Sequence, residues 1–289
     1  MINIQDITFR HTKHGDDIFN HLSLSIHPGK TYGLLGPNGS GKTTLLYITM
    51  GLLKPQQGQV EVEGTDVCKR SSDTLQELYL IPEEFELPSM TLSEYTKTYS
   101  PFYPNFSNEV LQQCLDIFQL PSDIHIDRLS MGQKKKLLMA FALACGTKYL
   151  LMDEPTNGLD IPSKKQFRKA IATNMTDERT ILISTHQVHD VEQLIDHVLI
   201  LGSPSQDASS NTLSTVLFDV ALPHLSSTLS FTYEQSPIPS QNSLYAERTP
   251  LGFATISPRL PDEEETPLNL ELLYNAVQNG KIPTNITTT

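Results

Sequence analysis

Alternating apolar and polar residues mark the first strands of this chain. Residues 2–9 and 22–26 alternate along the chain, which is typical of strands with one buried face. Residues 59–63, followed by Gly64-Thr65-Asp66, predict a hairpin at the edge of a sheet. Short and mostly apolar segments predict buried strands of a parallel sheet, and these are residues 31–35, 149–152, 180–184 and 198–201.

Helical patterns alternate with these strands. Residues 43–53 and 130–144 predict two helices, and residues 109–120 place four apolar side chains on one helical face. Prolines interrupt the helical pattern between residues 88 and 128. We therefore expect a parallel α/β core with a separate helical subdomain at about residues 84–145.

The composition changes after Gly202. Nine of the 19 prolines lie beyond this residue, together with many serines and threonines. Alternating segments at 215–221 and 252–256 and a helical pattern at 268–278 predict some folded structure, whereas residues 283–289 are expected to be loose. We therefore divide the chain into residues 1–202 and an accessory region of unknown function, 203–289.

Composition and charge exclude several classes of protein. The formal net charge of −12 opposes a general affinity for nucleic acid, and the one basic run, 134–136, is read as a solvated helix face. The three cysteines are scattered without metal-ligand spacing, so they are expected to be reduced thiols. The longest apolar run, 137–145, is too short to cross a bilayer, and no signal peptide is recognised, so a cytoplasmic location is expected.

A complete phosphate-binding loop follows the strand at 31–35. Its residues fit the pattern G-x-x-x-x-G-K-[ST] and are Gly36, Pro37, Asn38, Gly39, Ser40, Gly41, Lys42 and Thr43, with Thr44 next in the helix. The glycines let successive backbone N–H groups point at phosphate oxygens, and the helix N-terminus adds a positive dipole. Lys42 is expected to meet the β- and γ-phosphates of a nucleotide, and the Thr43 hydroxyl to ligate magnesium.

Three further segments carry candidate chemistry, each with a plainer alternative. Asp153 and Glu154 end an apolar strand, where Asp153 suits magnesium and Glu154 suits the attacking water, although such a pair also occurs on surface loops. Ser130 begins a helix, so it is either a phosphate ligand or an ordinary N-cap. His186 follows the strand at 180–184, where an isolated histidine is more often structural.

The segment Leu129-Ser130-Met131-Gly132-Gln133 lies between the phosphate loop and the acidic pair, and with them it resembles the nucleotide-binding subunit of an ATP-binding cassette (ABC) transporter. The resemblance covers residues 1 to about 202. It implies an α/β fold: a P-loop NTPase core with a mixed or parallel sheet, an antiparallel β subdomain and a helical subdomain, plus the small C-terminal region.

The resemblance also implies a role for each motif. Ser130, Gly132 and Gln133 would meet the γ-phosphate of ATP held by the opposite subunit of a homodimer, His186 would contact the γ-phosphate as a switch histidine, and Asp160 would communicate across the dimer. ATP and Mg²⁺ are the implied ligands. The implied partner is a separate transmembrane permease, docked near residues 84–120, which makes the protein peripheral at the cytoplasmic face of the cell membrane.

This chain departs from the family pattern in detail. Glu83 stands where the family usually has glutamine, which keeps an oxygen for magnesium but adds negative charge near the triphosphate. Met131 replaces the commoner glycine. For the aromatic residue that stacks on adenine, His11 is the candidate and Phe9 the alternative, while a plain surface role for His11 stays open.

These residues predict an ATPase that powers transport through ATP-driven closure and reopening of a dimer. Two other classes of function stay open. A soluble ABC ATPase acting on ribosomes or DNA is opposed by the acidic charge and by the short distance between Lys42 and Ser130, which leaves no room for a second cassette or a long coiled-coil insertion. A regulatory module that binds ATP without turnover is consistent with the extra charge of Glu83.

Overall fold

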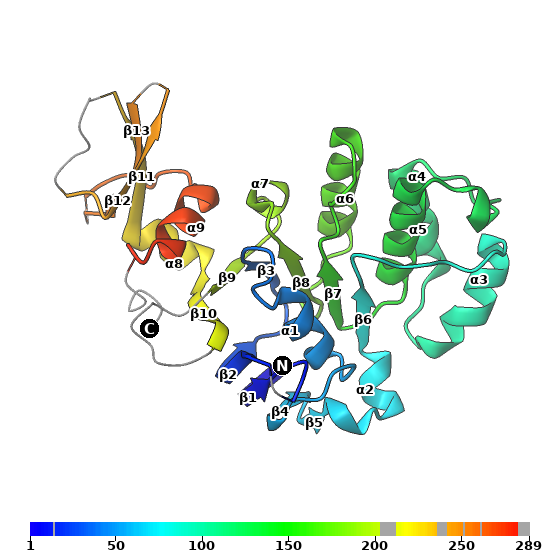
Figure 1. Cartoon of the computed structure of the whole chain (residues 1–289). Coiled ribbons are helices and arrows are strands. Elements are labelled where there is room, and N and C mark those ends of the chain that lie inside the picture. Colours follow the sequence, from blue (N-terminus) through cyan, green and yellow to red (C-terminus); the bar gives the residue numbers. More distant parts are fainter. Residues whose placement is uncertain (14, 203–211, 236–241, 251, 261, 283–289) are drawn as a thin grey trace.

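The main sheet contains ten strands in the order β5-β4-β1-β2-β10-β9-β3-β8-β7-β6 (Figure 1). The computed structural model describes residues 1–13, 15–202, 212–235, 242–250, 252–260 and 262–282. A second sheet has three strands in the order β11-β13-β12. The predicted α/β class is therefore confirmed, with a mixed main sheet and a small antiparallel sheet.

Five neighbouring strands form the parallel half of the main sheet. They are β9 (His197–Gly202), β3 (Thr31–Leu35), β8 (Thr180–Thr185), β7 (Tyr149–Asp153) and β6 (Leu78–Ile81). Their pairing is parallel throughout, and β3, β7 and β8 are buried along their whole length. Continuous burial explains why their sequences are mostly apolar rather than alternating.

Antiparallel strands complete the other side of the main sheet. They are β1 (Ile2–Phe9), β2 (Asp17–Ile26), β4 (Gln57–Val62) and β5 (Thr65–Asp66). The short β4–β5 hairpin lies at the sheet edge, as its turn residues predict. The alternating pattern of β1 and β2 places Ile2, Ile4, Leu24 and Ile26 in a core with helix α1 (Lys42–Thr49).

The predicted helical subdomain contains three helices, α3 (Leu92–Tyr99), α4 (Asn108–Phe118) and α5 (Met131–Ala144). Figure 1 shows them grouped beside β6, at the opposite end of the molecule from the small sheet. Each helix begins at a side-chain cap, namely Thr91, Ser107 and Ser130. Short helical segments complete this half of the chain, and they are η1 (Val67–Lys69), α2 (Ser72–Gln76), η2 (Ser100–Phe102) and η3 (Ile126–Arg128).

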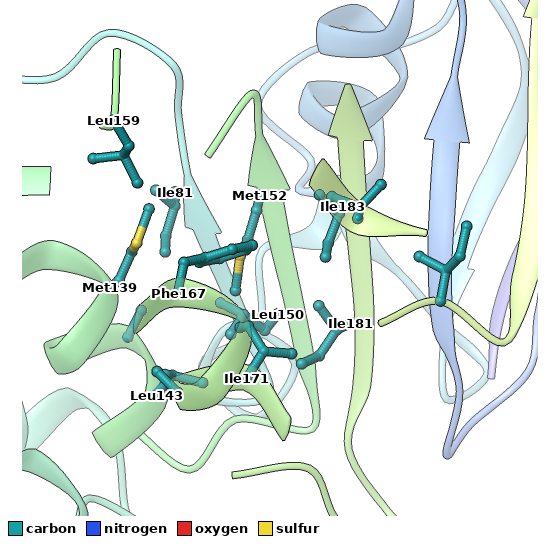
Figure 2. Packing of buried hydrophobic residues seen from close by; sticks show 14 of the residues in the cluster. Ile81, Met139, Leu143, Leu150, Met152, Leu159, Phe167, Ile171, Ile181 and Ile183 are labelled. Carbon is teal, nitrogen blue, oxygen red and sulfur yellow. The ribbon is translucent and has the colours of Figure 1, made fainter. Parts of the chain in front are cut away.

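Helices α5 and α6 (Ile161–Thr173) cover one face of the parallel strands (Figure 2). Phe167 of α6 points toward Met152 and Met139 of α5 points toward Ile81 of the sheet, and all four side chains are fully buried. Helix α1 packs on the other face, in the core that holds Leu151 and Leu182. These two layers fix the ends of β7 and β8, where the candidate site lies.

The chain beyond residue 202 forms two structures. Strand β10 (Thr212–Ala221) lies in the main sheet between β2 and β9, parallel to β2 and antiparallel to β9. The remainder consists of α8 (Leu222–Thr228), β11 (Leu229–Glu234), β12 (Tyr245–Thr249), β13 (Gly252–Pro258) and α9 (Leu270–Gln278). The division of the chain into two regions at residue 202 stays a prediction. Strand β10 shows, however, that the main sheet continues beyond this residue.

The strands and the helix expected in this region are present as β10, β13 and α9, but β11 and β12 were not predicted. Residues 283–289, which were expected to be loose, lie outside the described residues. Within the described part of the chain, every helix is too short or too polar to pass through a lipid bilayer.

Phe218 tests the importance of β10 for stability. Its side chain is 1% exposed and belongs to the core that also contains Val198 and Ile200 of β9. We expect Phe218→Ala to lower the free energy of unfolding by about 3–5 kcal/mol, because the substitution removes a buried ring and leaves a cavity. Urea denaturation followed by circular dichroism measures this change. Tyr233→Ala, at a 74% exposed position, is the control and should change stability by less than about 0.5 kcal/mol.

Candidate functional site

A cleft of about 410 Å³ lies at the carboxyl ends of the parallel strands. It draws residues from segments that are far apart in the sequence. Its lining residues are His11, Ile18, Asn38, Gly39, Gly41, Lys42, Thr43, Thr44, Glu83, Asp153 and Glu154. The fold therefore brings most of the predicted phosphate-loop, acidic and Glu83 positions to one place, as expected for the strand ends of an α/β sheet.

The phosphate loop connects β3 to α1 and contains two residues in the left-handed region, Gly39 at φ 83° and Gly41 at φ 84°. A Cβ atom at Gly41 would come within 2.8 Å of the Phe19 ring, so glycine is required there for space as well as for conformation. Ser40 Oγ is buried and has no hydrogen-bond partner among the described residues. An unpaired buried hydroxyl inside the loop is consistent with a site built for a polar ligand.

Lys42 places a positive charge at the base of the cleft. Its side chain is buried, and Nζ donates hydrogen bonds to the carbonyl oxygens of Gly36 at 2.8 Å and Pro37 at 3.2 Å. Burial lowers the pKa of the Lys42 ammonium, while the carboxylates of Glu154 and Asp153 act in the opposite direction. The ammonium can therefore bind an anion, which would interact with it more strongly than the two carbonyl groups do.

Asp153 and Thr43 form an oxygen pair suited to magnesium. Thr43 Oγ1 donates to Asp153 Oδ2 at 2.6 Å, and Ser184 Oγ donates to the other carboxylate oxygen. The described residues contain no group of three or more His, Cys, Asp or Glu side chains that could hold a metal ion. Because Mg²⁺ prefers one or two protein oxygens with water and phosphate, this pair fits a magnesium ion that arrives with a nucleotide.

Both the backbone and the side chain of Glu154 are constrained. Its backbone has φ 43°, which is uncommon for a residue other than glycine. Its carboxylate is 3.7 Å from Lys42 Nζ and accepts hydrogen bonds from Thr185 Oγ1 at 3.0 Å and from His186 Nδ1 at 2.8 Å. The predicted catalytic residues Glu154 and His186 are therefore in direct contact. Strained backbone of this kind is concentrated at functional sites.

The helix-start segment does not join this cleft. Ser130 Oγ accepts from the Gln133 N–H, and Gln133 Oε1 accepts from the Ser130 N–H, so the two residues form a capping box. Ser130 and Gln133 are exposed, Gly132 is half-buried, and none of the three lines the cleft of their own chain. The N-cap alternative therefore holds locally, and the segment is not part of the phosphate-loop cleft of the same chain.

Glu83 and His11 both line the cleft. Glu83 Oε1 accepts a hydrogen bond from Asn157 Nδ2 at 2.8 Å, which leaves its second oxygen for a ligand. His11 is exposed and packs edge-on against Phe9, with ring centroids 5.1 Å apart. Because Phe9 is buried, His11 is the better placed of the two candidates for stacking on a base. Asp160 lies outside the cleft and caps α6 by accepting from the Ser163 N–H.

One interpretation of the sequence was wrong. The basic run 134–136 was read as a solvated face, but Lys135 is 5% exposed and donates hydrogen bonds to the backbone carbonyl oxygens of Glu154 and Asn157. Its helical position explains the difference, because Lys135 precedes the fully buried Met139 by four residues on α5. This four-residue spacing is visible in the sequence and could have indicated that Lys135 is buried.

A second polar cluster was not predicted. Asp190, on α7 (Val188–Val191), accepts a hydrogen bond from Thr156 at 2.9 Å and forms an ion pair with Lys164 at 2.7 Å. Lys164 also donates to Gln187, directly after His186. These contacts join the segments that follow Glu154, Asp160 and His186, and no sequence motif marks them because they depend on tertiary contacts.

Comparisons with known proteins agree with this geometry. The ABC transporter family model matches residues 19–157. The chain is 36% identical over 188 residues to the ABC transporter ATP-binding protein YdbJ of Bacillus subtilis (strain 168), covering 64% of this chain and 61% of that protein. It is 31% identical to Nod factor export ATP-binding protein I of Burkholderia orbicola (strain AU 1054), covering 69% of each. It is 30% identical to the SkfA peptide export ATP-binding protein SkfE of Bacillus subtilis (strain 168), covering 68% of this chain and 84% of that protein.

Solved structures show the same fold. The ATP-binding subunit of an ABC transporter superposes with a TM-score of 0.66 at 21% identity, covering 78% of this chain and 91% of that chain. The dimeric structure of MJ0796, a bacterial ABC transporter cassette, superposes with a TM-score of 0.60 at 23% identity, covering 69% of this chain and 94% of that chain.

The two left-handed glycines allow a matched test of the loop. Alanine at Gly39 adds only backbone strain, because no atom lies within 4 Å of the new Cβ, whereas alanine at Gly41 also collides with Phe19. We expect Gly39→Ala to weaken nucleotide binding by about 1–2 kcal/mol and Gly41→Ala to weaken it further. Titration with a fluorescent adenine nucleotide measures both affinities. Equal losses in the two variants would show that the space around Gly41 is unimportant.

Proposed function

This chain belongs to the family of ABC transporter ATP-binding proteins, and we propose that it is the subunit that binds and hydrolyses ATP to power a separate transmembrane permease. The position of Glu154 carries this proposal. Its carboxylate is held by Thr185 and His186 beside the Lys42 ammonium, inside the phosphate-loop cleft. A carboxylate so placed can orient a water molecule or accept its proton next to a phosphate.

Several residues of the cleft have a specific role in this proposal. The backbone N–H groups of residues 38–44 surround the phosphates, and Lys42 exchanges its carbonyl partners for phosphate oxygens. Thr43 and Asp153, together with Glu83, hold Mg²⁺, which neutralises charge on the phosphates when it is bound. Glu154 orients the attacking water, and His186 keeps the Glu154 carboxylate in place and contacts the γ-phosphate.

We also propose that two copies of the chain close over two ATP molecules. Ser130, Gly132 and Gln133 do not line their own cleft, and they lie at an accessible helix N-terminus, which is suited to a phosphate on another copy. The dimer of the similarly folded MJ0796 cassette supports this arrangement. ATP binding and dimer closure would then be coupled, because the donors of both chains meet the γ-phosphate only in the closed state.

The permease is proposed to dock on the helical subdomain near residues 84–120. In this region Phe102 is 64% exposed, so its ring offers an apolar surface for contact with a partner. Two relatives are named for export, of Nod factors and of the SkfA peptide, which supports export as the direction. The protein would then lie at the cytoplasmic face of the membrane, attached through the permease.

Glu154→Gln tests the catalytic assignment. The amide keeps the shape of the side chain but cannot accept the proton of water, so we expect phosphate release to fall about 100-fold or more while ATP binding persists. Phosphate release and nucleotide titration measure the two properties. Glu271→Gln, on the exposed face of α9, is the control and should match the wild type. A wild-type protein that binds ATP without releasing phosphate would favour the regulatory module instead.

Ser130 tests the shared site. In the Glu154→Gln background we expect ATP to produce a dimer, and we expect Ser130→Phe to abolish that dimer because the ring blocks the helix N-terminus. Nucleotide binding to each monomer should persist, since Ser130 does not line its own cleft. Light scattering after size exclusion, with and without Mg-ATP, measures the dimer. A dimer that survives the substitution unchanged would contradict the proposed head-to-tail arrangement.

A further inference from the structure

We propose that Lys135 is a positioning residue for Glu154: its ammonium holds the backbone of the turn that carries the Glu154 carboxylate and ties that turn to helix α5. This inference rests on the proposed ATP hydrolysis. Lys135 lies outside the segment 129–133 and does not line the cleft, so it acts through Glu154 and not on the nucleotide.

The contacts of Lys135 are specific to the turn after β7. Its side chain is 5% exposed, and Nζ donates hydrogen bonds to the Glu154 carbonyl at 2.9 Å and the Asn157 carbonyl at 3.0 Å. The Asn157 N–H also donates to the Glu154 carbonyl, at 3.1 Å. One ammonium thus binds the carbonyl oxygens at both ends of the turn 154–157.

The turn needs such a restraint because Glu154 is in the left-handed region, at φ 43°. A residue with a Cβ atom keeps this conformation only where its surroundings enforce it. On the carboxylate side, Thr185 and His186 provide the restraint. On the backbone side, the Glu154 N–H donates to the Ser184 carbonyl and Lys135 donates to the Glu154 carbonyl.

Lys135 also brings a positive charge to this position. Burial lowers the pKa of the Lys135 ammonium, while the carboxylates of Glu83, Glu154 and Asp153 act in the opposite direction. Lys42 is the other buried ammonium beside Glu154. A neutral side chain without a donor at 135 would remove one cation from the surroundings of these three carboxylates, and it would leave the Asn157 carbonyl without the Lys135 hydrogen bond and the Glu154 carbonyl with the Asn157 N–H as its donor.

The position of Lys135 on α5 extends its effect beyond one site. It follows Ser130 by five residues on the same helix, and the α5 N-terminus is proposed to meet the γ-phosphate in the opposite half of the dimer. A helix is rigid over so short a distance. A shift of α5 on closure would therefore reach Glu154 of its own chain through Lys135.

The neighbouring lysines provide matched controls. Lys136 Nζ donates to the Phe118 carbonyl and to Gln166, both at 3.3 Å and both away from the cleft. The Lys134 side chain is half-buried and has no ion pair or hydrogen bond with the described residues. The three lysines thus share one helix and one chemistry but differ in whether they touch the Glu154 turn.

The test compares Lys135→Met with Lys134→Met and Lys136→Met in the full-length protein. We expect Lys135→Met to lower kcat for phosphate release by about 10- to 100-fold, because the general base is displaced, while KM stays within about threefold. The two control variants should keep the wild-type kcat. Lys135→Arg should recover most of the lost turnover, since a guanidinium can donate to the same two carbonyls.

A second readout does not require turnover. Hydrogen exchange, measured by mass spectrometry on a peptide containing residues 154–157, should be faster in Lys135→Met than in the wild type and in both controls. If Lys135→Met does not fold, Lys135→Gln takes its place in both measurements.

The possible outcomes separate this inference from the proposed function. Wild-type protein that does not release phosphate would refute the proposed function. The hydrogen-exchange rates of the peptide 154–157 would then still show whether Lys135 restrains this turn. A folded Lys135→Met variant with wild-type kcat and wild-type exchange would overturn the inference and leave the function intact. An equal loss of kcat in Lys134→Met, or a Lys135→Arg variant as impaired as Lys135→Met, would also overturn it.

Discussion

Parallel pairing of β3, β8 and β7 aligns the ends of these strands, so that Leu35 lies beside Thr185 and Asp153 beside Ser184. The phosphate loop leaves β3 at this edge, and the two acidic residues leave β7 there. The phosphate loop and the acidic pair, with Thr43 and Asp153 separated by 110 residues in the sequence, therefore meet at one edge of the sheet. The layers formed by α1 on one face and by α5 and α6 on the other hold the strand ends in this register.

Much of the site could be predicted because its chemistry is carried by local sequence. The phosphate loop requires glycines at the left-handed positions Gly39 and Gly41, and an apolar strand that ends in Asp153 and Glu154 identifies the acids. The core strands were visible for a similar reason, since burial on both faces demands continuous apolar residues. Positions fixed by local backbone geometry can be read from one short segment.

Other features could not be read in this way. The spacing of Lys135 from Met139 could have indicated its burial, but the carbonyl oxygens of Glu154 and Asn157 that accept its hydrogen bonds come from another part of the chain, and the basic run gives no sign of them. Strands β11 and β12 carry mixed polar residues, since they belong to a small sheet that buries little of β12. The exposed start of α5 forms a capping box whether or not a second chain contacts it. The sequence of this segment alone therefore does not distinguish a helix cap from a phosphate-binding site.

Strand β10 has a consequence for how the protein is made. Both of its neighbours, β2 and β9, precede it in the sequence, and each pairs with β10 on one side. During synthesis, which begins at the N-terminus, these two strands leave the ribosome with open edges, and the gap between them closes only after residue 221 has emerged. Open edges are prone to pair with other chains. The nascent protein therefore passes through an interval in which it is vulnerable to aggregation, and that interval lengthens wherever translation slows between Gly202 and Ala221.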